Sequence, residues 1–385
     1  MDGFEGDGMM AKLGDVATYI NGYAFKPSDW SDTGVPIIRI QDLTGNSYQA
    51  NRYNGEYAKK YEVLPGDVLI SWSASLGVYV WAGEKAVLNQ HIFKVVFDKC
   101  PIDKSFFVHQ VQEVLSKAES SAHGATMKHL TKPVFDALPF YLPSLDEQRR
   151  IAAVLDKVSG LIAKRREQLD KLDELVKARF VEMFGDCKTN PKGWKTCYLE
   201  DIAEVGSSKR VFVEELKDEG IPFYRGTEVG ALAEGMVITP ELFITEEHYK
   251  DLCEMTGKPQ KGDLLMPSIC PDGRIWLVDT DAPFYFKDGR VLWVHGISDK
   301  FDPVFLLYTL KDRITTDYSS IASGTTFAEL KIFALKKCQV FNAPVELQKK
   351  FSAFISVTNK SKLTIQQSLD KLEVLKKALM QQYFG

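Results

Sequence analysis

Two short polar runs in this sequence carry side chains that can read the edges of DNA bases. They contain Arg39, Gln41 and Asp42 in the first run and Arg225, Thr227 and Glu228 in the second. Arginine offers two parallel donors to guanine, glutamine pairs with adenine, and carboxylates accept hydrogen bonds from cytosine. Because the two runs differ in residue type, they are suited to two different base sequences. The alternative that stays open is that each arginine pairs with a neighbouring carboxylate and holds a turn.

Several other polar residues are candidates for DNA contact. Hydroxyls and backbone amides in the run 71–75 can hold a phosphate or a base edge, whereas Trp72 inside that run is expected in the core. His91 heads an apolar strand, where it either donates to DNA or serves as a structural histidine. Lys209, Arg210 and Arg274 are the preferred candidates for phosphate contact in the second domain. The complete set of these further candidates is Ser71, Ser73, Ser75, Asn89, Gln90, His91, Thr126, Lys128, His129, Lys209, Arg210, Arg274, Thr325 and Thr326.

Motifs for catalysis or for binding a cofactor are missing from the sequence. There is no Asn/Asp-Pro-Pro-Tyr/Phe run for methylating an amino group, no G-x-x-x-x-G-K-[ST] loop and no H-E-x-x-H motif. The fragments PD at 271–272 and ELK at 329–331 resemble parts of a nuclease site, but no strand pattern joins them and chance explains them better. Six cysteines without a C-x-x-C pair predict free thiols. We therefore expect a non-catalytic protein with no metal and no cofactor.

The composition predicts a globular protein that binds DNA locally rather than coating it. Hydrophobic residues make up 45% and charged residues 26% of the chain, and 48 basic against 52 acidic residues give a net charge of -4. Basic clusters such as KRR at 164–166 fit a limited stretch of DNA, although solvated helix faces also explain them. No apolar run approaches the roughly 20 residues that span a bilayer, and residues 1–12 lack a signal-peptide core. The expected location is the cytoplasm, with no membrane partner.

One module of the sequence is written twice. LDKLDELVKARFVEMFG closes the first half, and LDKLEVLKKALMQQYFG closes the second half 200 positions later. Upstream, GVPIIR matches GIPFYR and PGDVLI matches KGDLLM, with offsets that drift as loops change length. Such internal similarity indicates a duplicated structural unit. It predicts one scaffold that carries two different surfaces.

Each module is expected to be α+β, with short strands, a helix, a returning strand and then one long helix. The strands include VPIIRI, GDVLIS, GVYVWAG and HIFKVVF, and the returning strands are expected to be PVFDALPFYLP and IFALKKCQVF. The expected boundaries are residues 1–146 for the first β-rich domain, 147–185 for the central helix, 186–345 for the second β-rich domain and 346–385 for the C-terminal helix.

Apolar side chains recur along both long helices with alternating steps of four and three, the pattern of a heptad seam. The seam consists of Ile151, Leu155, Val158, Ile162, Leu169, Leu172, Val176, Phe351, Ile355, Ile365, Leu369, Leu372 and Leu379. The other copy in the same chain is the nearest partner; packing on the helix's own domain and pairing between chains remain alternatives. Antiparallel pairing would relate the modules by a pseudo-twofold axis and hold them at the ends of a rod about 55 Å long.

The order of these elements resembles the specificity subunit of type I restriction-modification systems. The resemblance rests on LPSLDEQRRIAAVLD and APVELQKKF at the starts of the long helices, on the final YFG, and on SWSASLGVYVW and NQHIFKV in the first β-rich domain. It covers nearly the whole chain, from about Leu13 onward. The helix-start motif with its repeat is the most specific part.

The resemblance implies two target recognition domains that each bind half of a split DNA sequence, and an antiparallel coiled coil that sets the spacing between the half-sites. It implies as partners double-stranded DNA, two copies of an adenine-methylating modification subunit, and restriction nuclease-translocase subunits. The chain itself would be the non-catalytic reader of this host-defence assembly. From the residues alone, two other functions stay open: a stand-alone DNA-binding regulator and a coiled-coil adaptor whose β-rich heads bind protein or carbohydrate.

Overall fold

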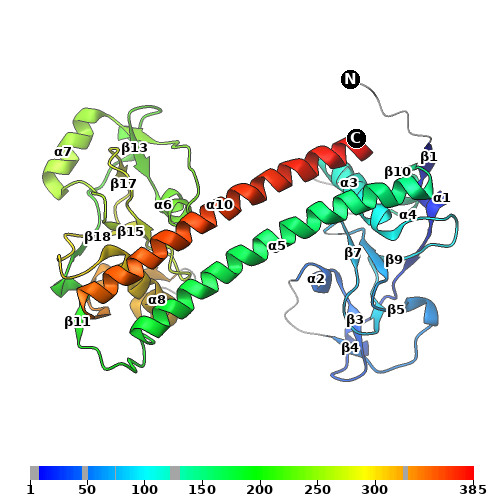
Figure 1. The fold of residues 1–385 in the computed structure, drawn as a ribbon, viewed down its shortest axis with the longest axis horizontal. Helices are drawn as coiled ribbons and strands as arrows, with labels where there is room; N and C mark the ends of the chain where they lie inside the picture. The colour runs from blue at the N-terminus through cyan, green and yellow to red at the C-terminus, as the bar shows by residue number, and fades with distance from the viewer. Residues whose placement is uncertain (1–7, 46–50, 74, 122–130, 324–327) are drawn as a thin grey trace. The chain divides into compact units, whose positions relative to one another are not determined.

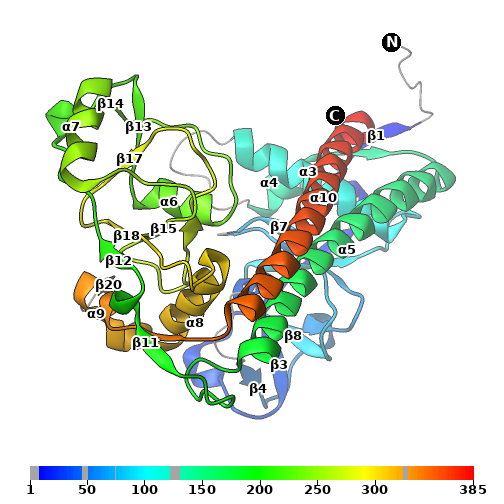
Figure 2. The ribbon, with the colours of Figure 1, turned by 60° about the vertical axis from the view of Figure 1, so that its left-hand side comes forward.

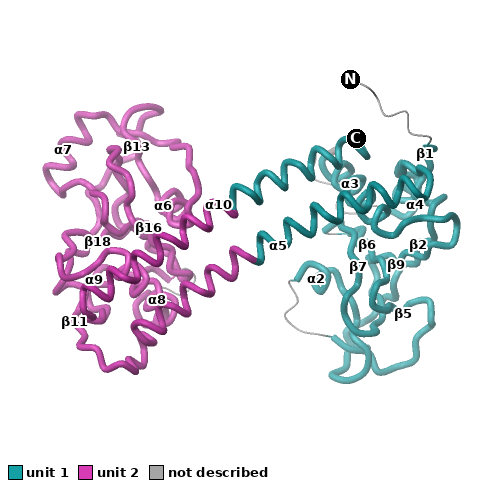
Figure 3. Tube along the Cα trace, viewed as in Figure 1, with its two compact units in different colours: residues 1–167, 366–385 teal, residues 168–365 magenta. Residues whose placement is uncertain are grey.

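The computed structural model describes residues 8–45, 51–73, 75–121, 131–323 and 328–385. It consists of two compact units, one formed by residues 1–167 with 366–385 and the other by residues 168–365 (Figure 3). Each unit therefore contains one β-rich region and a part of each long helix.

The first unit is built from short strands followed by helices (Figure 1). In chain order its elements are β1 (Met9–Lys12), α1 (Leu13–Val16), β2 (Thr18–Asn21), β3 (Val35–Ile38), α2 (Ile40–Leu43), β4 (Arg52–Tyr53), β5 (Glu62–Val63), β6 (Val68–Ser71), β7 (Gly77–Val80), β8 (Ala86–Leu88), β9 (Ile92–Val96), α3 (Lys104–Ser121), α4 (Lys132–Asp136), β10 (Pro139–Leu142) and the first part of α5 (Leu145–Phe184).

The second unit follows a similar order, with α7 added between β14 and β15. Its elements are β11 (Thr196–Tyr198), β12 (Glu204–Gly206), β13 (Ile221–Tyr224), α6 (Gly226–Ala233), β14 (Phe243–Ile244), α7 (Glu246–Thr256), β15 (Leu264–Pro267), β16 (Trp276–Leu277), β17 (Tyr285–Phe286), β18 (Val291–His295), α8 (Pro303–Ile321), β19 (Ala322–Ser323), β20 (Glu329–Leu330), α9 (Ile332–Lys336), β21 (Gln339–Phe341) and the first part of α10 (Val345–Phe384).

The two units also share their sheet topology. An antiparallel sheet has the order β2-β9-β6-β7 in the first unit and β12-β18-β15-β16 in the second. A second sheet pairs β3 with β8 and β13 with β17, in both cases in parallel, with β4 and β14 on the outer side. The duplication expected from the sequence is therefore a duplication of fold, and the α+β class is confirmed.

A shared turn before β6 and β15 explains the repeated Gly-Asp pair. Gly66 and Gly262 have φ values of 91° and 97°, a left-handed conformation that glycine adopts without a steric penalty. The next residue closes the turn in each unit: Asp67 Oδ2 accepts from the Leu64 N–H at 2.9 Å, and Asp263 Oδ2 accepts from the Gln260 N–H at 2.8 Å.

A buried glutamine joins each long helix to its own β-rich region. Gln148 Oε1 accepts from the Asp103 N–H at 2.9 Å, and its amide donates to the Pro143 carbonyl at 2.9 Å. Gln348 makes the same pair of bonds, to the Asp302 N–H at 2.8 Å and to the Ala343 carbonyl at 2.8 Å. Because a buried amide without partners is costly, these bonds account for the glutamine in both helix-start motifs.

In the first unit, the beginning of α5 pairs with the end of α10, so the helices run antiparallel (Figures 1 and 2). Leu155 of α5 and Met380 of α10 belong to one buried apolar cluster with the β-rich region. Phe384 packs edge-on against Phe106 of α3, with ring centroids 5.5 Å apart. The first β-rich region is thus packed against both long helices.

The second unit pairs the end of α5 with the beginning of α10 in the same antiparallel sense. Phe180 and Phe184 of α5 lie 5.5 and 5.7 Å from Phe351 of α10, measured between ring centroids, in a cluster that includes Phe305 of α8. In both units the apolar seam side chains of the two helices are buried or half-buried.

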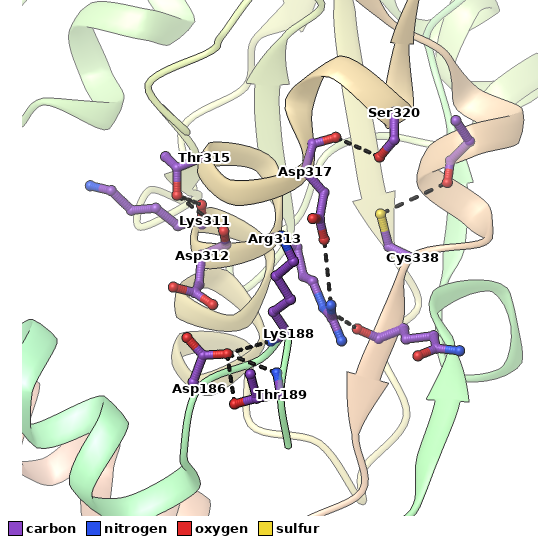
Figure 4. A network of polar contacts seen from close by, with 12 residues as sticks. Asp186, Lys188, Thr189, Lys311, Asp312, Arg313, Thr315, Asp317, Ser320 and Cys338 are labelled. Atoms are coloured by element: carbon purple, nitrogen blue, oxygen red, sulfur yellow. Dashed lines mark hydrogen bonds and ion pairs between the residues drawn. The ribbon is translucent and has the colours of Figure 1, made fainter. Parts of the chain in front are cut away.

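The linker after α5 folds onto the second unit (Figure 4). Asp186 accepts from the Lys188 and Thr189 N–H groups at 2.9 and 2.8 Å. Arg313 of α8 donates to the Gln339 carbonyl at 3.2 Å, which ties α8 to β21, and it pairs with Asp317 of the same helix at 3.4 Å.

Two expected strands need correction, and the helices α6 and α7, like the short α1 and α2, were not foreseen. The runs PVFDALPFYLP and IFALKKCQVF each begin with a helical turn, α4 and α9, and only their second halves are strand. Phe135 and Leu335 are the buried residues of these turns, so a short apolar run was mistaken for strand. The longest of these, α7, begins after Thr245, whose side chain accepts from the His248 N–H at 3.1 Å, and ends at Thr256, directly before Gly257.

Candidate nucleic-acid interface

The ends of three strands meet at one edge of each unit and bring polar residues together. In the first unit, the Asn89 N–H donates to the Ile38 carbonyl at 3.1 Å, and the Trp72 N–H donates to the His91 carbonyl at 3.3 Å. The segment 89–91 therefore connects the ends of β3, β8 and β6. We call residues 39–44, 71–73, 75 and 89–91 the first polar edge.

The second unit has the equivalent arrangement. The Lys287 N–H donates to the Tyr224 carbonyl at 2.9 Å, and the Ser268 N–H donates to the Arg290 carbonyl at 2.9 Å. We call residues 225–234, 268–274, 287–290 and 329–331 the second polar edge. Of the sequence candidates, the first edge contains Arg39, Gln41, Asp42, Ser71, Ser73, Ser75, Asn89, Gln90 and His91, and the second contains Arg225, Thr227, Glu228 and Arg274.

Arg39 stands at the start of α2 on the first polar edge. Its N–H donates to Asp42 Oδ2 at 2.7 Å, so the Asp42 carboxylate caps the helix. The Arg39 guanidinium lies 5.6 Å from the centre of the Trp30 ring, within the range of a cation–π contact. Gln41 is half-buried on the same short helix.

The serine run combines one exposed and two buried side chains. Ser71 is buried, and its hydroxyl donates to the Ser75 carbonyl at 2.6 Å and to the Ser73 carbonyl at 3.2 Å. Ser73 is also buried, whereas Ser75 is exposed. In this geometry Ser71 shapes the loop, and Ser75 is the hydroxyl best placed to meet a ligand.

The segment that heads β9 has an unusual backbone. His91 has a φ of 72°, which is uncommon for a residue other than glycine and often marks functional sites. The His91 ring lies 5.0 Å from the Trp72 ring, which in turn stacks 5.6 Å from Phe93, so Trp72 is anchored on the core. The Gln90 N–H donates to the Tyr23 carbonyl at 2.8 Å, which fixes the segment against the chain that follows β2.

Arg225 holds a turn at the start of α6. Its Nε donates to both carboxylate oxygens of Glu228 at 3.1 Å, and its Nη2 donates to Glu241 at 3.1 Å. Partial burial opposes ionisation of Glu228, but the hydrogen bonds from Arg225 outweigh it and lower the pKa of Glu228 to about 2. Thr227 is exposed, and its hydroxyl donates to Glu228 at 3.0 Å. This is the turn-holding geometry left open above.

Arg274 lies across the next turn of α6. Its Nε is 2.8 Å from Asp272 and its Nη1 is 3.9 Å from Glu234. A Cβ on Gly230 would come within 3.1 Å of Arg274 Nη1, so the glycine makes room for the guanidinium. Arg274 is therefore positioned by carboxylates on both sides.

Lys209 and Arg210 precede the second polar edge in the chain and flank it in space. The Lys209 N–H donates to the Tyr285 hydroxyl at 3.0 Å, and Arg210 pairs with Asp288 at 3.0 Å. Both side chains are exposed. Thr126, Lys128, His129, Thr325 and Thr326 lie outside the described residues.

The structure also adds a residue that the sequence comparison missed. Arg290 directly precedes β18, as His91 precedes β9, and both carbonyls accept from the loop after the neighbouring strand. The side chain of Arg290 pairs with Glu329. Aligning the start of HIFKVVF with RVLWVH would have placed His91 on Arg290, because the repeat offset has drifted to 199 at this point.

Comparison with known proteins identifies the family. The family model described as type I restriction modification DNA specificity domain matches residues 6–173 and again residues 191–375. The chain belongs to this family. It carries two copies of the specificity domain, in agreement with the two units, and the resemblance noted from the sequence is confirmed.

Relatives and solved structures agree with this membership. The chain is 31% identical over 168 residues to the EcoBI specificity subunit of Escherichia coli, an alignment that spans 43% of this chain and 35% of that protein. It is 25% identical to a putative specificity subunit of Haemophilus influenzae over 90% of both chains. The S subunit from M. genitalium has the same fold, with a TM-score of 0.58, 14% identity and coverage of 100% of this chain and 98% of that one.

As a type I specificity subunit, the protein recognises DNA sequence and is not itself an enzyme. The polar edges are thus the candidate surfaces for this recognition. Among the described residues, no helix is both long and apolar enough to cross a membrane.

Proposed function

We propose that residues 1–146 and 186–345 form two target recognition domains, each of which reads one half of a split double-stranded DNA site. The observation that carries this proposal is the pair of polar edges, which have the same backbone framework and different side chains. Arg225 occupies the position equivalent to Arg39, but it pairs with two glutamates. At the position equivalent to His91, the second unit has Arg290. One scaffold with two different surfaces suits two half-sites of different sequence.

The contacts divide by chemistry. Two exposed cations that flank the second edge, Lys209 and Arg210, are placed together with Arg274 to neutralise phosphates without reading sequence. The proposed base-reading or positioning groups are Thr227 in the second edge and, in the first, Arg39, Gln41, Ser75, Asn89, Gln90 and His91. Asp42, Glu228, Ser71 and Ser73 support them through the bonds described above.

The long helices are the proposed docking surface for two copies of a modification methyltransferase subunit. Outside the seam both helices expose apolar side chains, and a bound partner subunit would remove these side chains from water. These are Leu161, Leu175 and Val181 on α5 and Val357, Leu363, Val374 and Leu375 on α10. Restriction nuclease-translocase subunits then join to complete a cytoplasmic complex that methylates adenine and cleaves DNA.

A domain exchange tests the reading of half-sites. Residues 1–146 are replaced by the equivalent region of another type I specificity subunit, and the bound sequence is determined by selection from randomised duplexes in the presence of the modification subunit. We expect one half of the selected sequence to change and the other half to stay. A change in both halves would show that the two domains do not read independently.

A further inference from the structure

We propose that Arg290 is a specificity-determining residue that reads a guanine in the second half-site, and that Glu329 positions it. This inference deepens the proposed function and rests on it. It is carried by the fixed backbone of Arg290, by the exposure of its guanidinium and by the number of carboxylates around it.

The backbone of Arg290 is held by the neighbouring segments. Its carbonyl accepts from the Ser268 N–H at 2.9 Å, and the Ser268 carbonyl in turn accepts from the Leu330 N–H at 2.7 Å. A Cβ on Gly226, at the start of α6, would lie 3.4 Å from the Arg290 carbonyl oxygen. The backbone of Arg290 therefore lies where three elements meet: α6, β20 and the loop that follows β15. These contacts hold the base of the Arg290 side chain in a fixed position.

The side chain is exposed and has one carboxylate partner among the described residues. Arg290 Nη1 pairs with Glu329, and the two side chains are 57% and 27% exposed. By contrast, Arg225 pairs with Glu228 and Glu241, and Arg274 with Asp272 and Glu234. A guanidinium has five N–H donors, so a single carboxylate orients it and leaves a donor pair for guanine O6 and N7.

Glu329 is itself fixed. It belongs to β20, which pairs with β19 so that Ser323 lies opposite Glu329. Its Oε2 also lies 3.3 Å from Lys331 Nζ, so two cations hold the carboxylate in place. This arrangement orients Arg290 before DNA arrives and lowers the entropic cost of a bidentate contact.

The equivalent position in the first unit supports a role in specificity. His91 stands there, with a positive φ and a ring packed on Trp72. Histidine cannot make the forked contact of arginine, so the two units present different chemistry from the same backbone position. A residue that served only to fold the edge would not need to differ in this way.

The test begins once methylation mapping of the wild-type complex with its modification subunit has given the split motif. Dissociation constants are then measured at several salt concentrations for the mapped duplex and for each single-base substitution. The variants are R290K, R290Q and E329Q in the full chain. The matched controls are K337Q and E200Q, because Lys337 and Glu200 form a similarly exposed ion pair in the same unit.

We expect R290K and R290Q to lose discrimination by about five- to 150-fold at one G·C pair of the second half-site, with the first half unchanged. E329Q should lose part of the same discrimination without a change in salt dependence, which a merely structural residue would not do at a single base pair. The controls should match the wild type.

Two results would overturn the inference. If R290K binds like the wild type while R290Q weakens all duplexes equally and lowers the salt slope by about one, Arg290 contacts a phosphate. If neither variant changes discrimination, Arg290 does not read DNA. Failure of the wild-type complex to yield any motif would instead contradict the proposed function itself.

Discussion

Replacing Gln148 or Gln348 by leucine should loosen the attachment of one long helix to its own β-rich region. Leucine has a similar size but no polar atoms, so Gln148→Leu leaves the Asp103 N–H and the Pro143 carbonyl without their partner. Gln348→Leu leaves the Asp302 N–H and the Ala343 carbonyl in the same state. Each buried polar group without a partner costs about 1–3 kcal/mol, so each variant, which leaves two such groups, should lose about 2–6 kcal/mol of local stability.

Hydrogen exchange followed by mass spectrometry measures this loss separately in each unit. Gln148→Leu should accelerate exchange in α3 and leave α8 unchanged, and Gln348→Leu should do the reverse. Gln366→Leu is the matched control, because Gln366 is exposed on α10 and should change stability by less than about 0.5 kcal/mol. Equal acceleration in α3 and α8, or no acceleration, would refute the view that each glutamine fastens only its own module.

Three further predictions follow from the helices and the second polar edge. Phe351→Ala should destabilise the second unit by about 3–5 kcal/mol in urea denaturation, because Phe351 is fully buried, and a loss below about 1 kcal/mol would contradict this packing. Glu228→Gln should lower the free energy of unfolding by about 1–2 kcal/mol at pH 7, after allowance for solvent screening. The pKa of Glu228 is lowered from its ordinary value near 4.5 to about 2, so the charged carboxylate stabilises the fold fully above pH 4.5. The difference in stability between wild type and variant should therefore shrink as the pH falls toward 2, and a constant difference would contradict this. Seven residues inserted after residue 167 in α5, together with seven after residue 365 in α10, should widen the gap between the half-sites by about three base pairs. The reason is that a heptad lengthens a helix by about 10.5 Å. A mapped motif with the original gap would exclude the helices as spacers.

The repeat made most of the fold predictable from the sequence. The Gly-Asp turn and the helix-start glutamine recur because each makes the same backbone bonds twice, so spacing alone located them. Short apolar runs were less informative. The turns around Phe135 and Leu335 bury one side chain each, which a strand would also do, and periodicity over so few residues does not separate the two.

The candidate interface was only partly predictable. Arg225 was located by the repeat, but its pairing with Glu241 depends on how a distant loop folds back, which no local pattern indicates. Arg290 was not predicted because it lies between the longer matches of the repeat, where the loops of the two modules differ in length and the alignment offset changes. The helix α7 did carry signals, a capping Thr245 and a terminal Gly257, but it has no counterpart of similar length in the first module.

The most direct test of the central claim is to co-express this chain with a type I adenine-methylating modification subunit in a host that lacks such methylation, and to map modified adenines by single-molecule sequencing. The account predicts methylation at one split motif that disappears when this chain is omitted. Methylation that is absent although both proteins are folded, or that persists at the same sites without this chain, would contradict it.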